Sequence, residues 1–193
     1  MIKILSIDPG TSNLGYAYSE YDPKKKLMYV KELGAMTPSK DAKKAFTKED
    51  KNIFDMRLLN ILTVNKYYNE LVLKYNCHLH CSEDAFLHHM YPSSFIILSM
   101  CIHVMSNVLY NHYRTGTMSA KSAILYKFAP KHIKAVNITG TADKNDIKNA
   151  ILQNKQIKIN KTDIEQLDIS HISDAVAIGY TMVKYLEENE TIV

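Results

Sequence analysis

The 193-residue sequence contains little glycine, proline or cysteine: 6, 5 and 3 residues. So few Gly and Pro residues exclude a fibrous or low-complexity chain, and 46% hydrophobic with 23% charged residues excludes a disordered one. Three cysteines, an odd number without regular spacing, do not form a disulfide framework, so we expect a reducing compartment. The length predicts a single domain over residues 1–193 that buries about 70% of its unfolded surface.

Long apolar segments are also missing. The N-terminal residues lack the basic region and apolar stretch of a signal peptide, so we expect a cytoplasmic protein that is not secreted. The longest apolar run, Phe95–Tyr110, is shorter than the roughly 20 residues that span a bilayer, and Ser99, His103, Ser106 and Asn107 interrupt it. It predicts a buried helix in the core or at a subunit interface, and no membrane association.

The charge balance is mildly basic. There are 24 Lys and Arg residues against 20 Asp and Glu residues, a net charge of +4 with a pI near 8.8. This balance permits phosphate-rich partners without requiring them. Several lysines are candidates for a phosphate-contacting surface, although lysines also simply keep a protein soluble: Lys24, Lys25, Lys26, Lys43, Lys44, Lys121, Lys127, Lys131, Lys134 and Lys144.

The N-terminal quarter has the pattern of a strand meander. Apolar and β-branched residues predict strands over Ile2–Ile7, Leu14–Ser19 and Leu27–Leu33. The turn signal Asp8-Pro9-Gly10 separates the first two, and the charged segment Asp22–Lys26 connects the last two. We therefore expect three consecutive antiparallel strands.

The rest of the chain predicts mainly helices. Residues 37–52 lack periodicity and suggest an exposed connection or a frayed helix start. Further elements are expected as follows: helices from Ile53 to Leu73, Phe95 to Tyr110, Ala123 to Ala135, Asp143 to Leu152 and His171 to Glu188, and strands at Cys77–Glu83 and Thr115–Ala120. The buried face of the last helix is predicted to contain Ile172, Ala175, Val176, Gly179, Met182, Val183 and Leu186.

Two carboxylates close predicted strands. Asp8 is followed by Pro-Gly-Thr-Ser-Asn-Leu-Gly, a loop of small residues through Gly15 that would let a bulky anionic group approach the backbone. Glu83 ends the strand Cys77–Glu83. Neighbouring strand ends can bring carboxylates together, and their oxygens suit Mg²⁺ or Mn²⁺. The alternatives are that Asp8 only opens a turn and that Glu83 or its neighbours only cap a helix.

A third candidate group opens the last helix. His171 and Asp174 are three residues apart, so they project from one face of its first turn. Ala175, Ala177 and Gly179 keep the helix thin enough to approach a sheet. Capping would explain the neighbouring Ser and Asp residues more readily than it explains this His–Asp pair.

A zinc site at Cys77-His78-Leu79-His80-Cys81 is not expected. On a strand, residues 77, 79 and 81 face one side while His78 and His80 face the other. These side chains cannot surround one tetrahedral ion without breaking the strand.

These motifs resemble the RuvC Holliday-junction resolvases. The segment from Ile4 to Tyr16, with Asp8-Pro9-Gly10 and Gly15, is similar to the family's first motif. Glu83 followed by Phe86 resembles the second acidic motif, and His171 with Asp174 resembles the C-terminal motif, in which some members carry His first. Lys134 upstream of Gly140-Thr141-Ala142-Asp143-Lys144 is similar to the family's basic segment, whereas residues 37–52 have no clear counterpart.

The resemblance implies an RNase H-like α/β fold, with a mixed central sheet, three antiparallel N-terminal strands and flanking helices. It implies a crossover junction endodeoxyribonuclease of DNA recombination and repair that makes paired symmetric nicks in four-way DNA, in a bacterium or in a phage- or virus-infected cell. It also implies a homodimer, two Mg²⁺ or Mn²⁺ ions per site and no small-molecule cofactor.

Residue roles follow from the same resemblance. The implied metal ligands and catalytic residues are Asp8, Glu83, His171 and Asp174, with Asp8 between the ions and His171 as a ligand or general base. Phe86 would stack on an unpaired base, and Lys134 and Lys144 would contact DNA, with Lys144 near the scissile phosphate unless it is a solvated lysine at a helix start. Two alternatives remain: an RNase H-like nuclease acting on RNA or other branched nucleic acid, and an inactive junction-binding protein.

Overall fold

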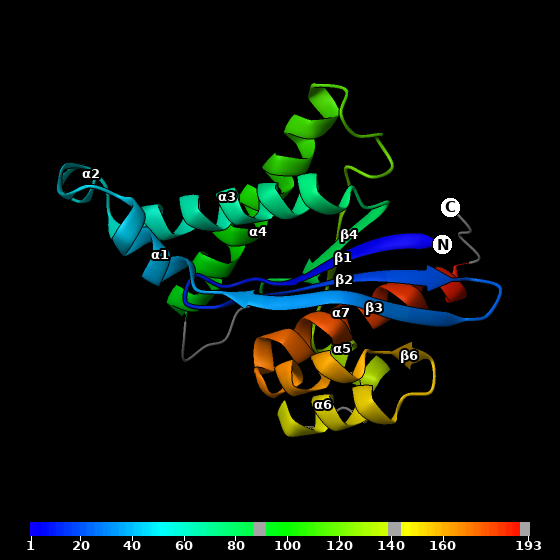
Figure 1. Ribbon diagram of the computed structural model, residues 1–193. Coiled ribbons are helices and arrows are strands. Elements are labelled where there is room, and N and C mark those ends of the chain that lie inside the picture. The colour runs from blue at the N-terminus through cyan, green and yellow to red at the C-terminus, as the bar shows by residue number, and fades with distance from the viewer. Residues whose placement is uncertain (87–91, 139–143, 190–193) are drawn as a thin grey trace.

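The computed structural model describes residues 1–86, 92–138 and 144–189 and contains a mixed six-stranded sheet (Figure 1). The strand order is β5-β4-β1-β2-β3-β6. The antiparallel strands β1, β2 and β3 form its centre, as the sequence predicted, while β4 pairs parallel to β1, β5 to β4 and β6 to β3. The strands are β1 (Ile2–Asp8), β2 (Leu14–Asp22), β3 (Leu27–Met36), β4 (Leu79–Glu83), β5 (Leu125–Phe128) and β6 (Ile157–Lys158).

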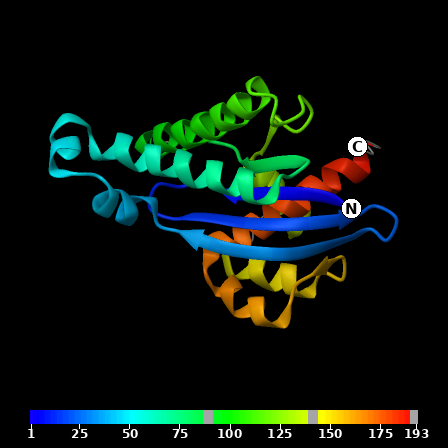
Figure 2. The ribbon, with the colours of Figure 1, turned by 45° about the horizontal axis from the view of Figure 1, so that its top comes forward.

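Helices cover both faces of the sheet (Figures 1 and 2). One face packs against α3 (Met56–Tyr75) and α4 (Pro92–Arg114), and the other against α5 (Pro130–Asn137), α6 (Lys144–Gln153) and α7 (Ser170–Glu188). Alternate residues of β1 serve the two cores: Ile4 packs on the α7 side, whereas Leu5 and Ile7 pack on the α3 side. The remaining helices are α1 (Pro38–Ala45), α2 (Lys48–Ile53) and the 3-10 helix η1 (Lys161–Asp168).

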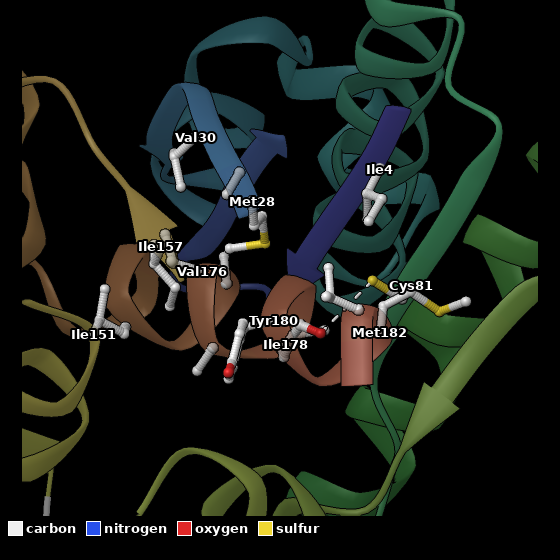
Figure 3. Close-up of a cluster of buried hydrophobic side chains, with 14 of the residues drawn as sticks. Ile4, Met28, Val30, Cys81, Ile151, Ile157, Val176, Ile178, Tyr180 and Met182 are labelled. Carbon is white, nitrogen blue, oxygen red and sulfur yellow. Dashed lines mark hydrogen bonds between the residues drawn. The ribbon is translucent and has the colours of Figure 1, made fainter. Parts of the chain in front are cut away.

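Helix α7 lies in the centre of one core (Figure 3). All seven residues predicted for its buried face are buried. Val176, Ile178 and Met182 belong to one hydrophobic cluster with residues of the sheet and of α6: Ile4 of β1, Met28 and Val30 of β3, Cys81 of β4, Ile157 of β6 and Ile151 of α6. The sheet therefore fixes where the helix begins, which matters because the candidate residues His171 and Asp174 lie in its first turn.

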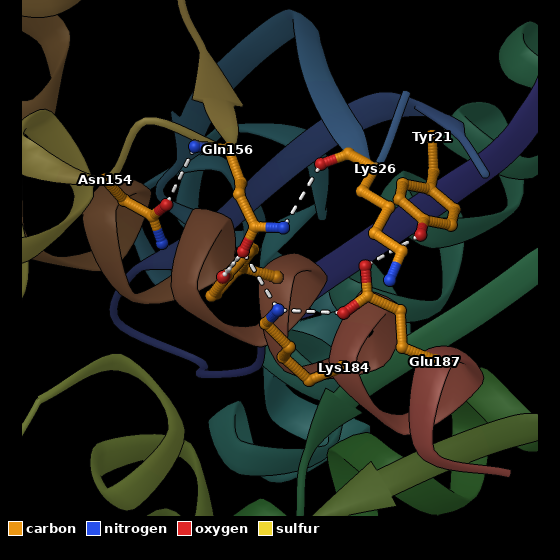
Figure 4. Close-up of polar contacts among 7 residues, drawn as sticks. Tyr21, Lys26, Asn154, Gln156, Lys184 and Glu187 are labelled. Carbon is orange, nitrogen blue, oxygen red and sulfur yellow. Dashed lines mark hydrogen bonds and ion pairs between the residues drawn. The ribbon is translucent and has the colours of Figure 1, made fainter. Parts of the chain in front are cut away.

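A polar network holds the far end of α7 (Figure 4). Lys184 Nζ donates to Gln156 Oε1 at 2.9 Å and to Glu187 Oε2 at 2.8 Å. Tyr21 OH of β2 donates to Glu187 Oε1 at 2.8 Å, and Gln156 Nε2 donates to the Lys26 carbonyl at 3.3 Å. The network connects α7 to the β2–β3 hairpin and to the segment before β6.

The structure corrects the prediction between α4 and α5. The strand expected at Thr115–Ala120 is absent; this segment forms turns in which the Thr115 and Thr117 hydroxyls donate to carbonyls of the last turn of α4. The strand is β5 instead, and the helix expected from Ala123 starts at Pro130, which has no N–H to lose at a helix start.

Residues 37–52, expected as an exposed connection or a frayed helix start, form two short helices. Pro38 starts α1, and Thr47 with Asp50 forms a capping box at α2. The helix expected from Ile53 to Leu73 is present as α3 and begins at Met56, because Ile53 ends α2; its apolar residues Leu62 and Leu73 are exposed.

Helix α4 is longer and more exposed than its sequence predicted. Cys101, Met105 and Leu109 are buried against the α3 side of the core, whereas Ile96 and Tyr110 are more than half exposed. By length and composition alone the stretch Ser93–Arg114 is apolar enough to cross a membrane, a property that core helices of soluble proteins share. The buried-helix prediction therefore holds for one face only.

Buried His80 makes the fold sensitive to acid. Its side chain on β4 is fully buried, with Nδ1 3.1 Å from Tyr68 OH, and burial lowers its pKa to about 4. Because the unfolded chain takes up a proton near pH 6.5 and the folded chain does not, stability falls as the pH decreases from about 6.5 to about 4, by on the order of 3 kcal/mol. Urea unfolding at several pH values should show this loss.

His80→Leu is the control for that experiment. It removes the titrating group at similar volume, so the variant should lose less stability between about pH 6.5 and pH 4 than the wild type, whatever its stability at neutral pH. An identical pH dependence in both proteins would assign the effect to other groups.

Candidate active site

The site begins where two neighbouring strands end. Asp8 is the last residue of β1 and is 7% exposed. Strand β4 runs parallel to β1 with Ile7 opposite Ser82, so Glu83 follows at the same edge of the sheet. Asp8 and Glu83 both line a cleft of about 630 Å³.

The first turn of α7 brings a second pair of side chains to this cleft. His171 Nδ1 lies 2.6 Å from Asp8 Oδ2, a contact between residues 163 positions apart. Asp174 faces the same way, and one potential ligand atom from each of Asp8, His171 and Asp174 lies within 4.8 Å of the others. This arrangement can hold a metal ion, as the sequence analysis anticipated for these three residues.

Gly15 explains how α7 approaches the strands so closely. It pairs with Asp8 in the β1–β2 register. A Cβ added to Gly15 would lie 2.0 Å from the His171 carbonyl oxygen and 2.4 Å from the carbonyl carbon, far inside contact distance. The small residues of this segment were expected to let an anionic group approach the backbone; at Gly15 the space is filled by the protein's own backbone.

Three of the other predicted residues line the same cleft. Glu83 lines it but does not belong to the group of three with mutually close ligand atoms. Phe86, which is 48% exposed, and Lys134 of α5 also line the cleft. Lys144 begins α6, but its side chain and the preceding residues 139–143 lie outside the part of the chain that the structure describes.

Apolar residues of α5, α6 and α7 form the rest of the cleft wall. Pro130, Ile133, Ile147 and Ile178 line it together with Ser94 of α4. No sequence motif singled them out, because ordinary core positions and wall positions share the same apolar pattern. The four apolar side chains offer no ligand atoms that would compete with Asp8, His171 and Asp174.

The Cys77–Cys81 segment forms no metal site. Cys77 packs in the core beneath α3, whereas Cys81 packs in the core with α7. His78 Nδ1 accepts the Lys3 backbone N–H, and His80 contacts Tyr68. Within residues 1–86, 92–138 and 144–189, the group with metal-site geometry among His, Cys, Asp and Glu is the one at Asp8.

Sequence comparison finds no match among protein-family models or curated proteins. Comparison with solved structures defines the class of fold: the chain has the RNase H-like fold, as predicted. Its similar structures include RuvC of Thermus thermophilus (14% identity, TM-score 0.63, 97% of each chain covered). They also include the yeast mitochondrial Holliday junction resolvase (12% identity, TM-score 0.68, 98% of this chain and 82% of that one).

A third similar structure is the fowlpox virus resolvase in complex with Holliday junction DNA (14% identity, TM-score 0.56, 96% of this chain and 99% of that one). The particular form of the RNase H-like fold is thus the one found in RuvC-like resolvases. The likeness extends along nearly the whole chain.

Proposed function

We propose that the protein is a structure-selective DNA endonuclease that resolves four-way junctions by paired symmetric nicks. The observation that carries this proposal is the Asp8–His171–Asp174 group in a cleft at the end of β1. The fold supports the choice of substrate, because RuvC of Thermus thermophilus and the fowlpox virus resolvase have both been solved with Holliday junction DNA.

The donor set fits divalent ions that prefer oxygen ligands. Asp8 and Asp174 supply carboxylate oxygens, His171 supplies an imidazole nitrogen, and Glu83 offers a further carboxylate in the same cleft. We propose that Asp8, Glu83, His171 and Asp174 would together hold two Mg²⁺ or Mn²⁺ ions. Bound ions of this kind activate water and balance the charge that develops during phosphodiester hydrolysis.

His171 is proposed to move the proton. Its Nδ1 contacts Asp8 Oδ2 at 2.6 Å, and in the neutral imidazole that donates Nδ1–H to this carboxylate, Nε2 is the acceptor. The carboxylate fixes the tautomer and the ring orientation. Nε2 is therefore the atom that we assign to accept a proton from the attacking water, when His171 does not itself bind metal.

Phe86, Lys134 and Lys144 are proposed to bind DNA. Exposed Phe86 at the cleft offers a ring on which an unpaired base can stack, an interaction worth about 1–3 kcal/mol per base. Lys134 lines the cleft on the α5 side, where its charge favours a phosphate. Lys144 keeps the role that the family resemblance implies, close to the scissile phosphate.

We also propose that the protein acts as a homodimer, since two paired nicks need two sites. Helix α4 leaves several large apolar side chains exposed: Ile96, Met100, Tyr110 and Tyr113. Such a surface on a soluble protein is typical of a subunit contact. Light scattering at micromolar concentration distinguishes a dimer from a monomer.

The decisive experiment compares a mobile four-way DNA junction, a linear duplex and a structured RNA, each with Mg²⁺, Mn²⁺ or chelator. Metal-dependent symmetric nicks confined to the junction are expected. Cutting of RNA alone would replace the proposed substrate, and tight junction binding without cutting would indicate a binding protein instead of an enzyme.

A further inference from the structure

Helix α1 lies beside the loop that follows Asp8. The Ser39 backbone N–H, in the first turn of α1, donates to the Thr11 carbonyl of that loop at 2.8 Å. Figures 1 and 2 show α1 and α2 extending past the sheet near the β1–β2 connection. The helix is therefore attached to the catalytic end of the molecule, although residues 37–52 had no counterpart in the motifs of the resolvases.

The two sides of α1 differ in character. Ala42 is fully buried, and Asp41 accepts a hydrogen bond from Tyr67 OH of α3 at 2.7 Å, so this side is fixed to α3. Lys40, Lys43 and Lys44 are exposed, and their spacing of three and four residues places them on one face. The inner contacts leave that lysine face turned to solvent.

The lysine face of α1, defined as Lys40, Lys43 and Lys44, is not neutralised. Among the described residues no carboxylate forms an ion pair with any of the three. Six other lysines in the described part of the chain do form such pairs: Lys25, Lys31, Lys66, Lys74, Lys148 and Lys184. Lys51 of α2 adds a fourth charge nearby, because its Nζ donates to the Lys43 carbonyl at 2.6 Å.

Lysines without ion pairs to described residues also lie near the α5 wall of the cleft. Lys127 of β5 and Lys131 of α5 are exposed, and Lys134 lines the cleft itself. Uncompensated positive charge is thus present both on α1 and around α5. A branched nucleic acid whose crossover occupies the cleft sends duplex arms in more than one direction, so separate basic surfaces fit it better than one continuous patch.

From this geometry we propose that the lysine face of α1 binds the phosphate backbone of a duplex arm of the substrate. This inference rests on the proposed function, because it takes the substrate to be branched DNA. The face contains ammonium groups and no aromatic or amide side chain, so it contacts phosphates without reading base sequence. It adds to the cleft an arm-binding element on a helix with no counterpart in the family motifs.

The test is the triple variant Lys40→Gln/Lys43→Gln/Lys44→Gln, which removes three charges and keeps good helix formers. The matched control is Lys24→Gln/Lys25→Gln/Lys26→Gln at the β2–β3 hairpin, with the same change in net charge. This hairpin lies at the opposite end of the meander from the β1–β2 loop. Junction affinity is measured with chelator, which prevents cutting, over a series of salt concentrations.

At about 0.1 M salt we expect the α1 variant to bind the junction on the order of 10- to 100-fold more weakly, and the slope of log affinity against log salt to fall by about 2 to 3. The hairpin control should change affinity only a few-fold, and melting temperatures should stay equal. Equal affinity and slope in the two triple variants would overturn the inference, while metal-dependent junction cutting by the wild type would leave the proposed function standing.

The proposed function can also fail while the inference about α1 holds. In that case the wild-type protein would bind a linear duplex and not a junction, and only the α1 variant would lose duplex binding. This result would overturn the proposed function and support α1 as a duplex-binding face. A wild-type protein that binds none of the nucleic acids would overturn both.

Discussion

Asp8→Asn is expected to reduce the rate of metal-dependent junction cleavage by about 10³-fold or more, with the fold preserved. The amide removes the anionic charge from the centre of the group, where Asp8 lies close to both His171 and Asp174. A loss of about 4 kcal/mol in stabilisation of the transition state corresponds to a rate factor of about 10³. Single-turnover cleavage at saturating enzyme measures this rate independently of junction affinity.

The matched control is Asp163→Asn. Asp163 lies in η1 and does not line the cleft, so the same chemical change should leave the cleavage rate unaltered. Thermal melting with and without Mn²⁺ provides a second readout, because binding of the ion to the folded state raises the melting temperature. Cleavage at the wild-type rate by Asp8→Asn would remove Asp8 from the mechanism.

Gly15→Ala should reduce the cleavage rate by about 10²-fold and also destabilise the protein. The added methyl group would meet the His171 carbonyl oxygen at 2.0 Å, so the first turn of α7 must move away from β2. His171 and Asp174 would then leave their positions beside Asp8, and a displacement of about 1 Å in an active site is enough for such a loss. The junction affinity should change much less than the rate.

Gly116→Ala separates this effect from general instability. Gly116 has a φ of +72° in a turn, and nothing lies within 4 Å of a Cβ added there. The substitution should cost about 1 kcal/mol of stability through its backbone conformation and leave the cleavage rate unchanged. If Gly15→Ala proved less stable but equally fast, the position of His171 would not limit the reaction.

Local patterns predicted the parts of the fold that have strong periodicity. Apolar and β-branched residues identified β1, and spacings of three and four identified the buried face of α7. The prediction failed between Thr115 and Pro130, where turns and a short edge strand replace the expected elements. There the hydroxyls of Thr115 and Thr117 cap α4, an interaction that propensity does not reveal.

The sequence predicted which residues form the candidate site, but it did not predict the distances between them. Asp8 at a strand end and His171 with Asp174 at a helix start are local signals, and the structure brings them together. Their mutual distances depend on tertiary packing, above all on the contact between Gly15 and the His171 backbone. The sequence also grouped Glu83 with the other acids. Glu83 lines the same cleft, but it is not one of the three residues whose potential ligand atoms lie close together.

The hydrogen bond between Asp8 and His171 joins the first strand to the last helix across 163 positions of the chain. During translation the ribosome adds about 5–20 residues per second, so on the order of 8 to 30 s separate the synthesis of these two partners. A nascent chain that carries Asp8 and lacks α7 has no complete metal-binding group. Under the proposed function, copies that terminate before α7 would therefore lack nuclease activity, and activity would arise only after α7 has been synthesised.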